Sequence, residues 1–184
     1  MVGFVGVTGL SGSGKTTAVE YLSRLTSGRI LYLGQTVLDE VRARGLSETR
    51  DNERHVRIDL RRERGPAALA IPHVNWVAEC VENGMPIFVD AIFNQEEFNV
   101  LAYRIPSGFA RLLAIDASLA IRSARLACRP ERPFNVDELR ERDKTELEKL
   151  GTAAVMAAAE HTIRNEETLD EFYRRLAAFV SCCA

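Results

Sequence analysis

The sequence lacks any apolar run long enough to cross a bilayer, so it predicts no membrane-spanning protein. No positively charged segment with a cleavage site accompanies the apolar start at residues 2–8, and we therefore expect no signal peptide and a cytoplasmic location. The net charge of −2 offers no broad positive field, which argues against a nucleic-acid partner or a membrane partner. A length of 184 residues fits one domain, expected to span residues 1–184.

Cysteine and histidine are scarce, and neither has the spacing of a metal site. The adjacent Cys182 and Cys183 are poorly placed to bind one tetrahedral ion, and Cys80 and Cys128 stand apart from them. We expect these four thiols to be reduced. The three histidines have no neighbouring nucleophile that the sequence reveals, so each is expected to have a structural role.

Lysine is nearly absent, with three residues against 21 arginines. Eight arginines lie between residues 42 and 64, and six lie between residues 122 and 142. The rigid fork of donors on arginine suits phosphate oxygens and the charge of a transferring phosphoryl group. These groups therefore indicate phosphate chemistry; the alternatives are solvated helix faces or a genome that favours arginine over lysine.

One of the three lysines lies in the most informative segment of the chain. This segment follows an apolar strand-like run and opens a helical pattern, which is the context that a phosphate-binding loop requires. Its glycines let successive N–H groups point at phosphate oxygens, its lysine reaches the β- and γ-phosphates, and its first threonine completes a magnesium shell. The predicted nucleotide-binding residues are Gly9, Ser11, Gly12, Ser13, Gly14, Lys15, Thr16 and Thr17. The alternative is a chance glycine-rich turn.

Strand and helix patterns alternate along the rest of the chain. Strands are expected at residues 2–8, 29–33, 86–90, 110–116 and 161–164. Helices are expected at residues 16–25, 35–46, 51–64, 67–83, 94–102, 119–128, 136–159 and 169–180, with a break near Gly151. Apolar strands that alternate with helices predict an α/β fold with a parallel sheet covered on both faces.

Ligands of such sheets bind at the carboxyl ends of the strands, and this rule points to a metal-binding acid. Asp90 ends the third expected strand, at the same edge of the sheet as the phosphate loop, and can hold magnesium together with Thr16. The alternative for Asp90 is a capping role in a turn. Asp116 also ends a strand, but it precedes a helix and is the better N-cap candidate.

The arginines between residues 122 and 132 are spaced by three, four and three residues. Arg122, Arg125 and Arg129 would therefore share one face of a helix, with Arg132 in the proline-flanked turn beyond it. If these arginines face the phosphate loop, they would bind the negatively charged phosphate groups; the alternative is a solvated helix face.

Several motifs together resemble a known family. They are the phosphate loop; Gly34 with Arg44-Gly45; Leu60-Arg61 with Gly65 and Ala70; Val89-Asp90; Ala117-Ser118 leading to the arginines just described; Arg142-Asp143 with Glu146 and Gly151; and Thr162-Ile163 with Asn165. Over about residues 3–175 the chain resembles the P-loop kinases of the nucleoside monophosphate kinase class. It is most similar to archaeal-type dephospho-coenzyme A kinase-like and deoxynucleotide kinase-like proteins.

The resemblance implies a three-layer P-loop NTPase fold with five parallel strands in the order 2-3-1-4-5. It also implies transfer of the γ-phosphoryl group of ATP, with Mg²⁺, to a nucleotide or another small phosphorylated metabolite. Residues 34–65 would form the acceptor-binding lobe, and residues 129–136 a short lid. The residues implied for catalysis are Lys15, Asp90, Arg125 and Arg129. Arg122 and Asn165 would join the nucleotide site, with Asn165 near the adenine.

The chain departs from the family on the acceptor side. Relatives usually carry an aspartate and an arginine where this chain has Gln35 and Leu38, and Gly-Ile-Arg where it has Ala91-Ile92-Phe93. Arginines of the neighbouring helices would replace the missing grip; the candidates are Arg42, Arg54, Arg57 and Arg61. Glu96 and Glu97 would add polarity to the acceptor site, unless they lie on an exposed helix face.

Two functions therefore remain open. The first is a phosphotransferase that acts on a small acceptor. The second is a nucleotide-binding regulatory or switch protein that hydrolyses ATP slowly while its arginine-rich lobe engages a partner. Release of ADP that depends on an acceptor would favour the first, and nucleotide-dependent partner binding without acceptor turnover would favour the second.

Overall fold

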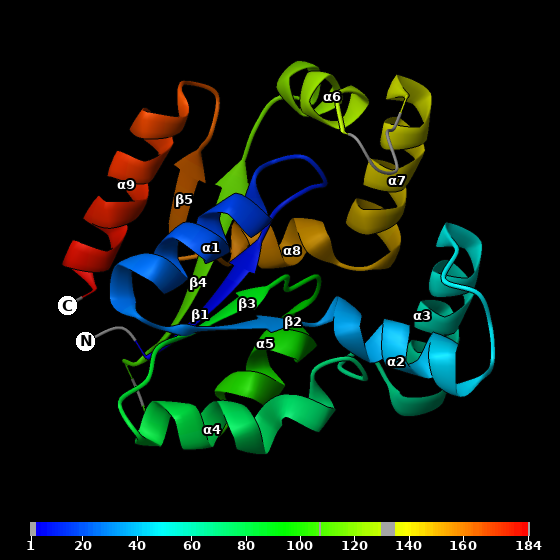
Figure 1. Ribbon diagram of the computed structural model, residues 1–184, viewed down its shortest axis with the longest axis horizontal. Helices are drawn as coiled ribbons and strands as arrows, with labels where there is room; N and C mark the ends of the chain where they lie inside the picture. The colour runs from blue at the N-terminus through cyan, green and yellow to red at the C-terminus, as the bar shows by residue number, and fades with distance from the viewer. Residues whose placement is uncertain (1–2, 107, 130–134, 184) are drawn as a thin grey trace.

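A computed structural model describes residues 3–106, 108–129 and 135–183, and its centre is a parallel β-sheet (Figure 1). The strands are β1 (Phe4–Thr8), β2 (Arg29–Tyr32), β3 (Ile87–Asp90), β4 (Ala110–Asp116) and β5 (His161–Arg164). They pair in parallel in the order β2-β3-β1-β4-β5. The expected five-stranded parallel sheet and its strand order are therefore confirmed.

Helices follow most of the expected positions. They are α1 (Lys15–Thr26), α2 (Gly34–Ala43), α3 (Arg50–Arg64), the 3₁₀ turn η1 (Ile71–His73), α4 (Val74–Glu82), α5 (Gln95–Ala102), α6 (Leu119–Ala127), α7 (Val136–Lys149), α8 (Thr152–Ala157) and α9 (Leu169–Cys182). Within the described residues, no helix combines the length and apolar character needed to cross a membrane.

One expected helix begins later than predicted, and another breaks where a break was expected. The helix expected at residues 67–83 begins only at Val74, because Pro72 disfavours the helical conformation of the residue before it and the chain forms turns and η1 instead. The helix expected at residues 136–159 breaks into α7 and α8 at Gly151, as anticipated. Gly151 has a φ of 81°, a left-handed conformation that glycine adopts without strain.

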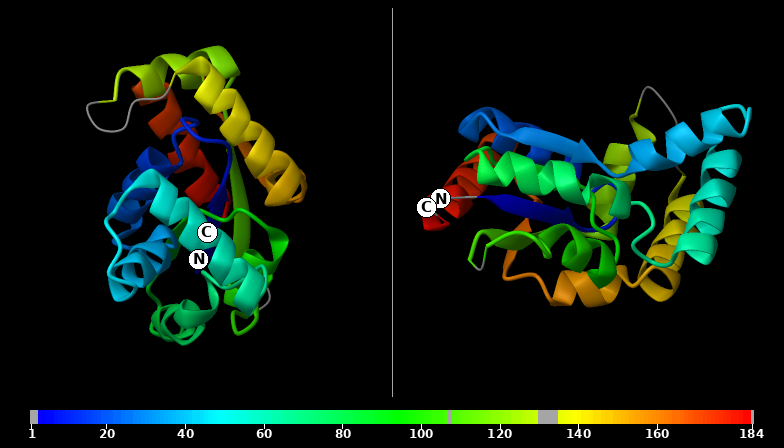
Figure 2. Two further views of the ribbon diagram at one scale, coloured as in Figure 1. Left: turned by 90° about the vertical axis from the view of Figure 1, so that its right-hand side faces the viewer. Right: turned by 90° about the horizontal axis from the view of Figure 1, so that it is seen from below.

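Helices cover both faces of the sheet (Figure 2), and a hydrophobic cluster lies between the helices and each face, as the apolar strands required. Phe4 of β1 packs into the cluster beneath α2 to α5 and α8, whereas its neighbours Val5 and Val7 pack against α1 and α9. This alternation follows from the two-residue period of a strand. Because all five strands are parallel, their carboxyl ends lie at one edge of the sheet. Figure 2 shows α3 and α7 at that same end of the molecule.

Candidate active site

The predicted phosphate loop links β1 to α1. Gly9, Gly12 and Gly14 all have positive φ angles, at 142°, 83° and 106°. A side chain at Gly9 would lie 2.2 Å from the carbonyl oxygen of Ile115, so only glycine fits there. The first turn of α1 has no side-chain cap and no acidic residue, which leaves its N–H groups available to an anion. The loop therefore has the conformation and the donors that a phosphate group requires.

Lys15 is folded over the loop itself. Its Nζ donates to the carbonyl oxygens of Gly9 at 2.8 Å and Leu10 at 3.1 Å. Burial lowers the pKa of Lys15, and the negative charges of Glu146 and then Asp90 offset part of that effect. When a phosphate binds, Lys15 Nζ would donate to its oxygens in place of these carbonyl oxygens, because a charged acceptor forms the stronger hydrogen bond.

Thr16 and Asp90 lie together at this edge, in the arrangement expected of a magnesium site. The Thr16 hydroxyl donates to Asp90 Oδ2 at 2.7 Å, and Asp90 is 8% exposed at the end of β3. Among the described residues, no group of three or more acidic, histidine or cysteine side chains could hold a metal ion without further ligands. Hydroxyl and carboxylate oxygens fit Mg²⁺, which normally takes its remaining ligands from waters and substrate phosphates.

Asp116 has a different environment from the one expected. The helix α6 is preceded by Ser118 at its N-cap, and the Ser118 N–H bonds to Glu166 Oε1 at 2.8 Å. The backbone oxygen of Asp116 accepts from the Asn165 N–H at 2.7 Å. The expectation that Asp116 caps the helix is therefore wrong, because the strand continues to it and the chain needs two further residues to turn.

Arg122 lies behind the phosphate loop, and its guanidinium is occupied by protein acceptors. Its Nη1 and Nη2 form a two-pronged pair with Asp143 at 2.9 and 2.7 Å, Nη1 also donates to Ser11 O at 3.1 Å, and Nε donates to Ala117 O at 3.0 Å. With 4% of the residue exposed, it has no remaining face for a nucleotide. In this structure Arg122 therefore contacts the backbone of the loop, and its predicted contact with the nucleotide stays a prediction.

This arrangement predicts a large loss of stability for Arg122→Ala. The free energy of unfolding should fall by about 3 kcal/mol, because the change leaves the buried carboxylate of Asp143 without its partner. Chemical denaturation would measure the loss. Arg140→Ala is the matched control on α7, since it removes an exposed ion pair with Asp137 and should cost less than about 0.5 kcal/mol. Equal costs for the two variants would contradict this interpretation.

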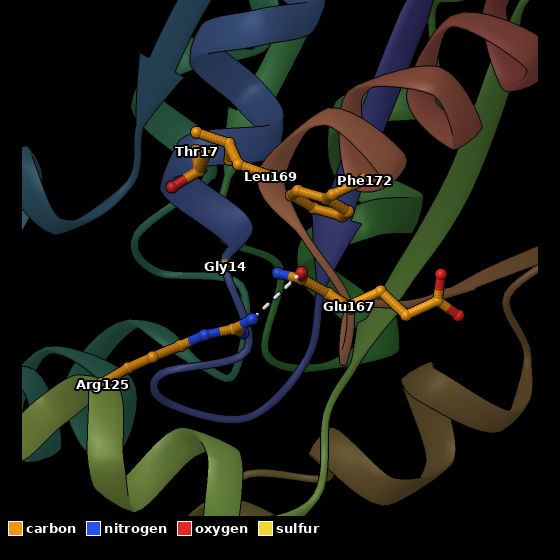
Figure 3. A pocket seen from close by; sticks show the side chains of 7 residues that line it. Gly14, Thr17, Arg125, Glu167, Leu169 and Phe172 are labelled. Atoms are coloured by element: carbon orange, nitrogen blue, oxygen red, sulfur yellow. Dashed lines mark hydrogen bonds between the residues drawn. The ribbon is translucent and has the colours of Figure 1, made fainter.

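A cavity of about 210 Å³ adjoins the loop on the side of α6 and α9 (Figure 3). It is lined by Gly14, Thr17, Arg125, Asn165, Glu167, Leu169 and Phe172. Asn165 Nδ2 donates to Ser13 O at 2.8 Å, and Arg125 Nη2 donates to Asn165 Oδ1 at 3.2 Å. Figure 3 shows Arg125 reaching from α6 toward the loop and Glu167 directed away from Arg125. The cavity thus has an apolar wall and a polar wall, which suit a base and its sugar.

The predicted lid is described only at its ends. Arg129 is exposed just beyond the end of α6, and Val136 begins α7. Residues 130–134, which include Arg132, lie outside the described residues.

The predicted substrate-binding arginines separate into different environments. Arg42 forms exposed ion pairs with Glu48 and Asp39, and Arg54 is exposed on α3. Arg61 differs from both, because its side chain is only 12% exposed and donates to the fully buried Glu97 at 2.7 Å. Of these three arginines, the structure therefore brings only Arg61 to the edge of the sheet where Asp90 lies.

Two further arginines accompany Arg61. Burial lowers the pKa of Arg57, and the positive charges of Arg142 and Arg61 add to this effect, with only partial compensation from Tyr32 and Glu53. In the described part of the chain, Arg57 forms no ion pair, and Arg61 Nε and Nη1 are buried without a hydrogen-bond partner. Cations gathered in this way are typical of a site for an anionic ligand.

The acidic residues near this cluster were only partly anticipated. Glu97 is buried and also accepts from the Phe93 N–H at 2.8 Å, whereas Glu96 lies on an exposed helix face, so the exposed-face alternative holds for Glu96 and not for Glu97. Glu146 of α7 accepts from the Ser11 hydroxyl at 3.1 Å and from Arg142 Nε at 2.7 Å. The four-residue spacing of Arg142 and Glu146 was the available signal, since it places them on one helix face.

Gln35, Leu38 and Phe93 stand where relatives of the family carry charged residues, and none of the three supplies that charge. Gln35 is exposed and bonds to Asp39 at 2.7 Å, and Leu38 and Phe93 are half-buried. None of these three side chains could grip an acceptor phosphate by charge. The positive charge near β3 comes instead from α3 and α7.

Comparison with other proteins identifies the family. A family model described as an AAA domain matches residues 5–149. A UPF0200 protein of Aeropyrum pernix is 33% identical over 97% of this chain and 94% of its own length, and one of Thermococcus onnurineus is 30% identical over 95% and 94%.

Solved structures show the same fold. TT1252 from Thermus thermophilus is similar with a TM-score of 0.65 and 20% identity over 100% of this chain and 98% of its own. Shikimate kinase from Bacteroides thetaiotaomicron is similar with a TM-score of 0.61 and 16% identity over 97% and 98%. The chain therefore belongs to the UPF0200 family of P-loop proteins and has the kinase-like fold of the nucleoside monophosphate kinase class.

Proposed function

We propose that this protein transfers the γ-phosphoryl group of ATP to a small anionic acceptor. One observation carries the proposal: the phosphate loop and the Thr16–Asp90 pair share an edge of the sheet with Arg57, which forms no ion pair among the described residues, and with Arg61, two of whose buried nitrogens have no hydrogen-bond partner there. A regulatory ATPase needs the loop and the metal ligands, but it has no need of a half-buried site for a second anion. The kinase-like fold is a second observation that supports a phosphotransferase.

On the donor side, the chain supplies positioning and charge. Lys15 would leave the carbonyl oxygens of the loop and bind the β- and γ-phosphates, while the N–H groups of α1 hold the phosphate chain. Thr16 and Asp90 would hold magnesium, which neutralises charge that builds up between the phosphates. Arg125 and Asn165 would form the polar wall of the base cavity and fix the adjacent loop, and the charge of Arg125 would also act on the transferring phosphoryl group.

On the acceptor side, Arg57, Arg61 and Arg142 would hold the anionic group of the acceptor. Glu97 fixes one prong of Arg61 and leaves two of its nitrogens for a ligand. In this proposal, arginines of α3 and α7 would bind the acceptor in place of the charged residues that are absent at Leu38 and Phe93. A nucleotide, a coenzyme-like molecule or another small phosphorylated metabolite would satisfy such a site.

The direct test is magnesium-dependent release of ADP from ATP. The acceptors to screen are ribo- and deoxynucleoside monophosphates, dephospho-coenzyme A and simple phosphorylated metabolites. Stimulation by one class of acceptor, lost in Lys15→Ala, supports the proposal. Tight ATP binding, no stimulation by any of them and nucleotide-dependent capture of a protein partner would instead support the switch ATPase.

Arg125 provides a second check on the donor side. Arg125→Ala should lower turnover by about tenfold or more and weaken ATP binding by less, if its charge acts mainly on the transferring group. Single-turnover kinetics together with equilibrium titration separate the two effects. Turnover that falls only in proportion to ATP affinity would instead limit Arg125 to building the wall of the base cavity. The same comparison applies to Arg129, whose exposed position allows it to approach a bound nucleotide.

A further inference from the structure

Glu146 is a buried carboxylate at the phosphate loop that the proposed roles do not use. It is 4% exposed, and its Oε1 accepts both the Ser11 hydroxyl and Arg142 Nε. Its Oε2 is buried without a hydrogen-bond partner among the described residues. A buried carboxylate oxygen without a donor is unfavourable, so the surrounding positive charges must hold this side chain in place.

The position of Glu146 follows from its contact with the phosphate loop: it accepts from the Ser11 hydroxyl at 3.1 Å, and Lys15 Nζ donates to the carbonyl oxygen of Leu10, the residue before Ser11. Among the negative charges that raise the pKa of Lys15 against burial, Glu146 has a larger effect than the metal-site residue Asp90. Lys15 is the side chain that reaches the β- and γ-phosphates in a loop of this type. Glu146 therefore places a negative charge beside the end of the site that receives the γ-phosphate.

The helix that carries Glu146 is attached to the loop at two points. Asp143 holds Arg122, which donates to the carbonyl oxygen of Ser11, and Glu146 accepts from the Ser11 hydroxyl. The two acids are three residues apart and so lie on the same face of α7. With Asp143 fixed by a two-pronged ion pair, the backbone of α7 cannot easily carry Glu146 away from the loop.

From these contacts we propose that Glu146 makes the nucleotide site distinguish triphosphates from diphosphates. Its charge disfavours the γ-phosphate, while a diphosphate that ends at the β-phosphate is less affected because repulsion falls with distance. To admit the γ-phosphate, Glu146 gives up the Ser11 hydroxyl and Arg142 Nε. The inference rests on the nucleotide-binding half of the proposed function and not on the identity of the acceptor.

The test is a comparison of two binding constants in Glu146→Gln. Glutamine keeps the shape and an acceptor oxygen for Ser11 and Arg142 but removes the charge. The Kd for adenylyl imidodiphosphate with magnesium should fall about tenfold, as expected for removing a nearby unit charge in a partly buried site. The Kd for ADP with magnesium should change less than about twofold. Calorimetric titration gives both values, and guanine nucleotides are titrated in parallel to cover the other base.

Glu148→Gln is the matched control. It makes the same change on the same helix at an exposed position and should leave both constants unchanged. Equal changes for the two nucleotides in Glu146→Gln, or no change in either, would overturn the proposal. If the glutamine variant binds neither nucleotide, Glu146→Ala repeats the comparison, because it also removes the charge.

The outcome is separable from that of the proposed kinase activity. A Glu146-dependent preference between the nucleotides, without turnover of any acceptor, would uphold this inference and refute the phosphotransferase. Failure of the unaltered protein to bind any di- or triphosphate would overturn both.

Discussion

Lys15→Ala is expected to reduce kcat/KM for ATP at least about 100-fold and to weaken triphosphate binding strongly. The side chain is the single cation that the loop directs at the β- and γ-phosphates, and removing one such charged donor costs about 3 kcal/mol in comparable sites. Equilibrium titration of adenylyl imidodiphosphate and steady-state ADP release would measure the two effects.

Lys144→Ala is the matched control for this experiment. Lys144 is one of the other two lysines, lies exposed on α7, and carries the same charge. Its replacement should leave both measurements unchanged. Undiminished binding and turnover in Lys15→Ala would refute the nucleotide-binding role of the loop and, with it, the proposed function.

Arg57→Ala is expected to raise the KM for the acceptor about 30-fold or more while the Kd for ATP stays within about twofold. Arg57 forms no ion pair in the described part of the chain, so its replacement leaves no protein carboxylate without a partner. The variant should therefore fold normally, and the loss should reflect the missing charge toward the ligand. Initial rates at varied acceptor concentration, once the screen has identified one, would measure it.

Arg62→Ala is the control on the same helix. Its side chain is 69% exposed and pairs with Asp59 on the surface of α3, away from the buried cluster. It should change neither constant. An acceptor KM that rises equally in the two variants would show that the lobe attracts the acceptor by general charge and that Arg57 does not contact it.

The geometry of the phosphate loop and of the Thr16–Asp90 pair could be predicted well, because the information for it is local. The spacing of the phosphate loop fixes its own backbone, and the rule for strand ends of a parallel sheet brings Asp90 to Thr16. The resemblance to the kinases supplied the strand order, which the structure confirms. A break near Gly151 was also predictable, since glycine readily adopts the left-handed conformation observed there.

The environments of the arginines proposed to bind the acceptor could not be predicted to the same level. Eight arginines lie between residues 42 and 64, and their charge alone does not say which of them face inward. The burial of Val56 and Leu60 sets the rotation of α3, and this rotation brings Arg57 and Arg61 toward the site while Arg54 and Arg62 remain exposed. Arg42 lies on α2, where it pairs with the exposed acids Asp39 and Glu48, so its predicted contact with the acceptor stays a prediction.

The sequence by itself determined the phosphate loop, the α/β class and the acid at the end of β3, because each depends on residues close in the chain or on a general rule of parallel sheets. Only the tertiary structure decided the partners of the charged side chains. Arg122 and Asp143 are 21 residues apart, and Ser11 and Glu146 are 135 residues apart. Whether an arginine binds a ligand or a protein carboxylate depends on which charges the fold brings within a few ångströms, because electrostatic attraction falls with distance and is screened by water wherever a side chain is exposed.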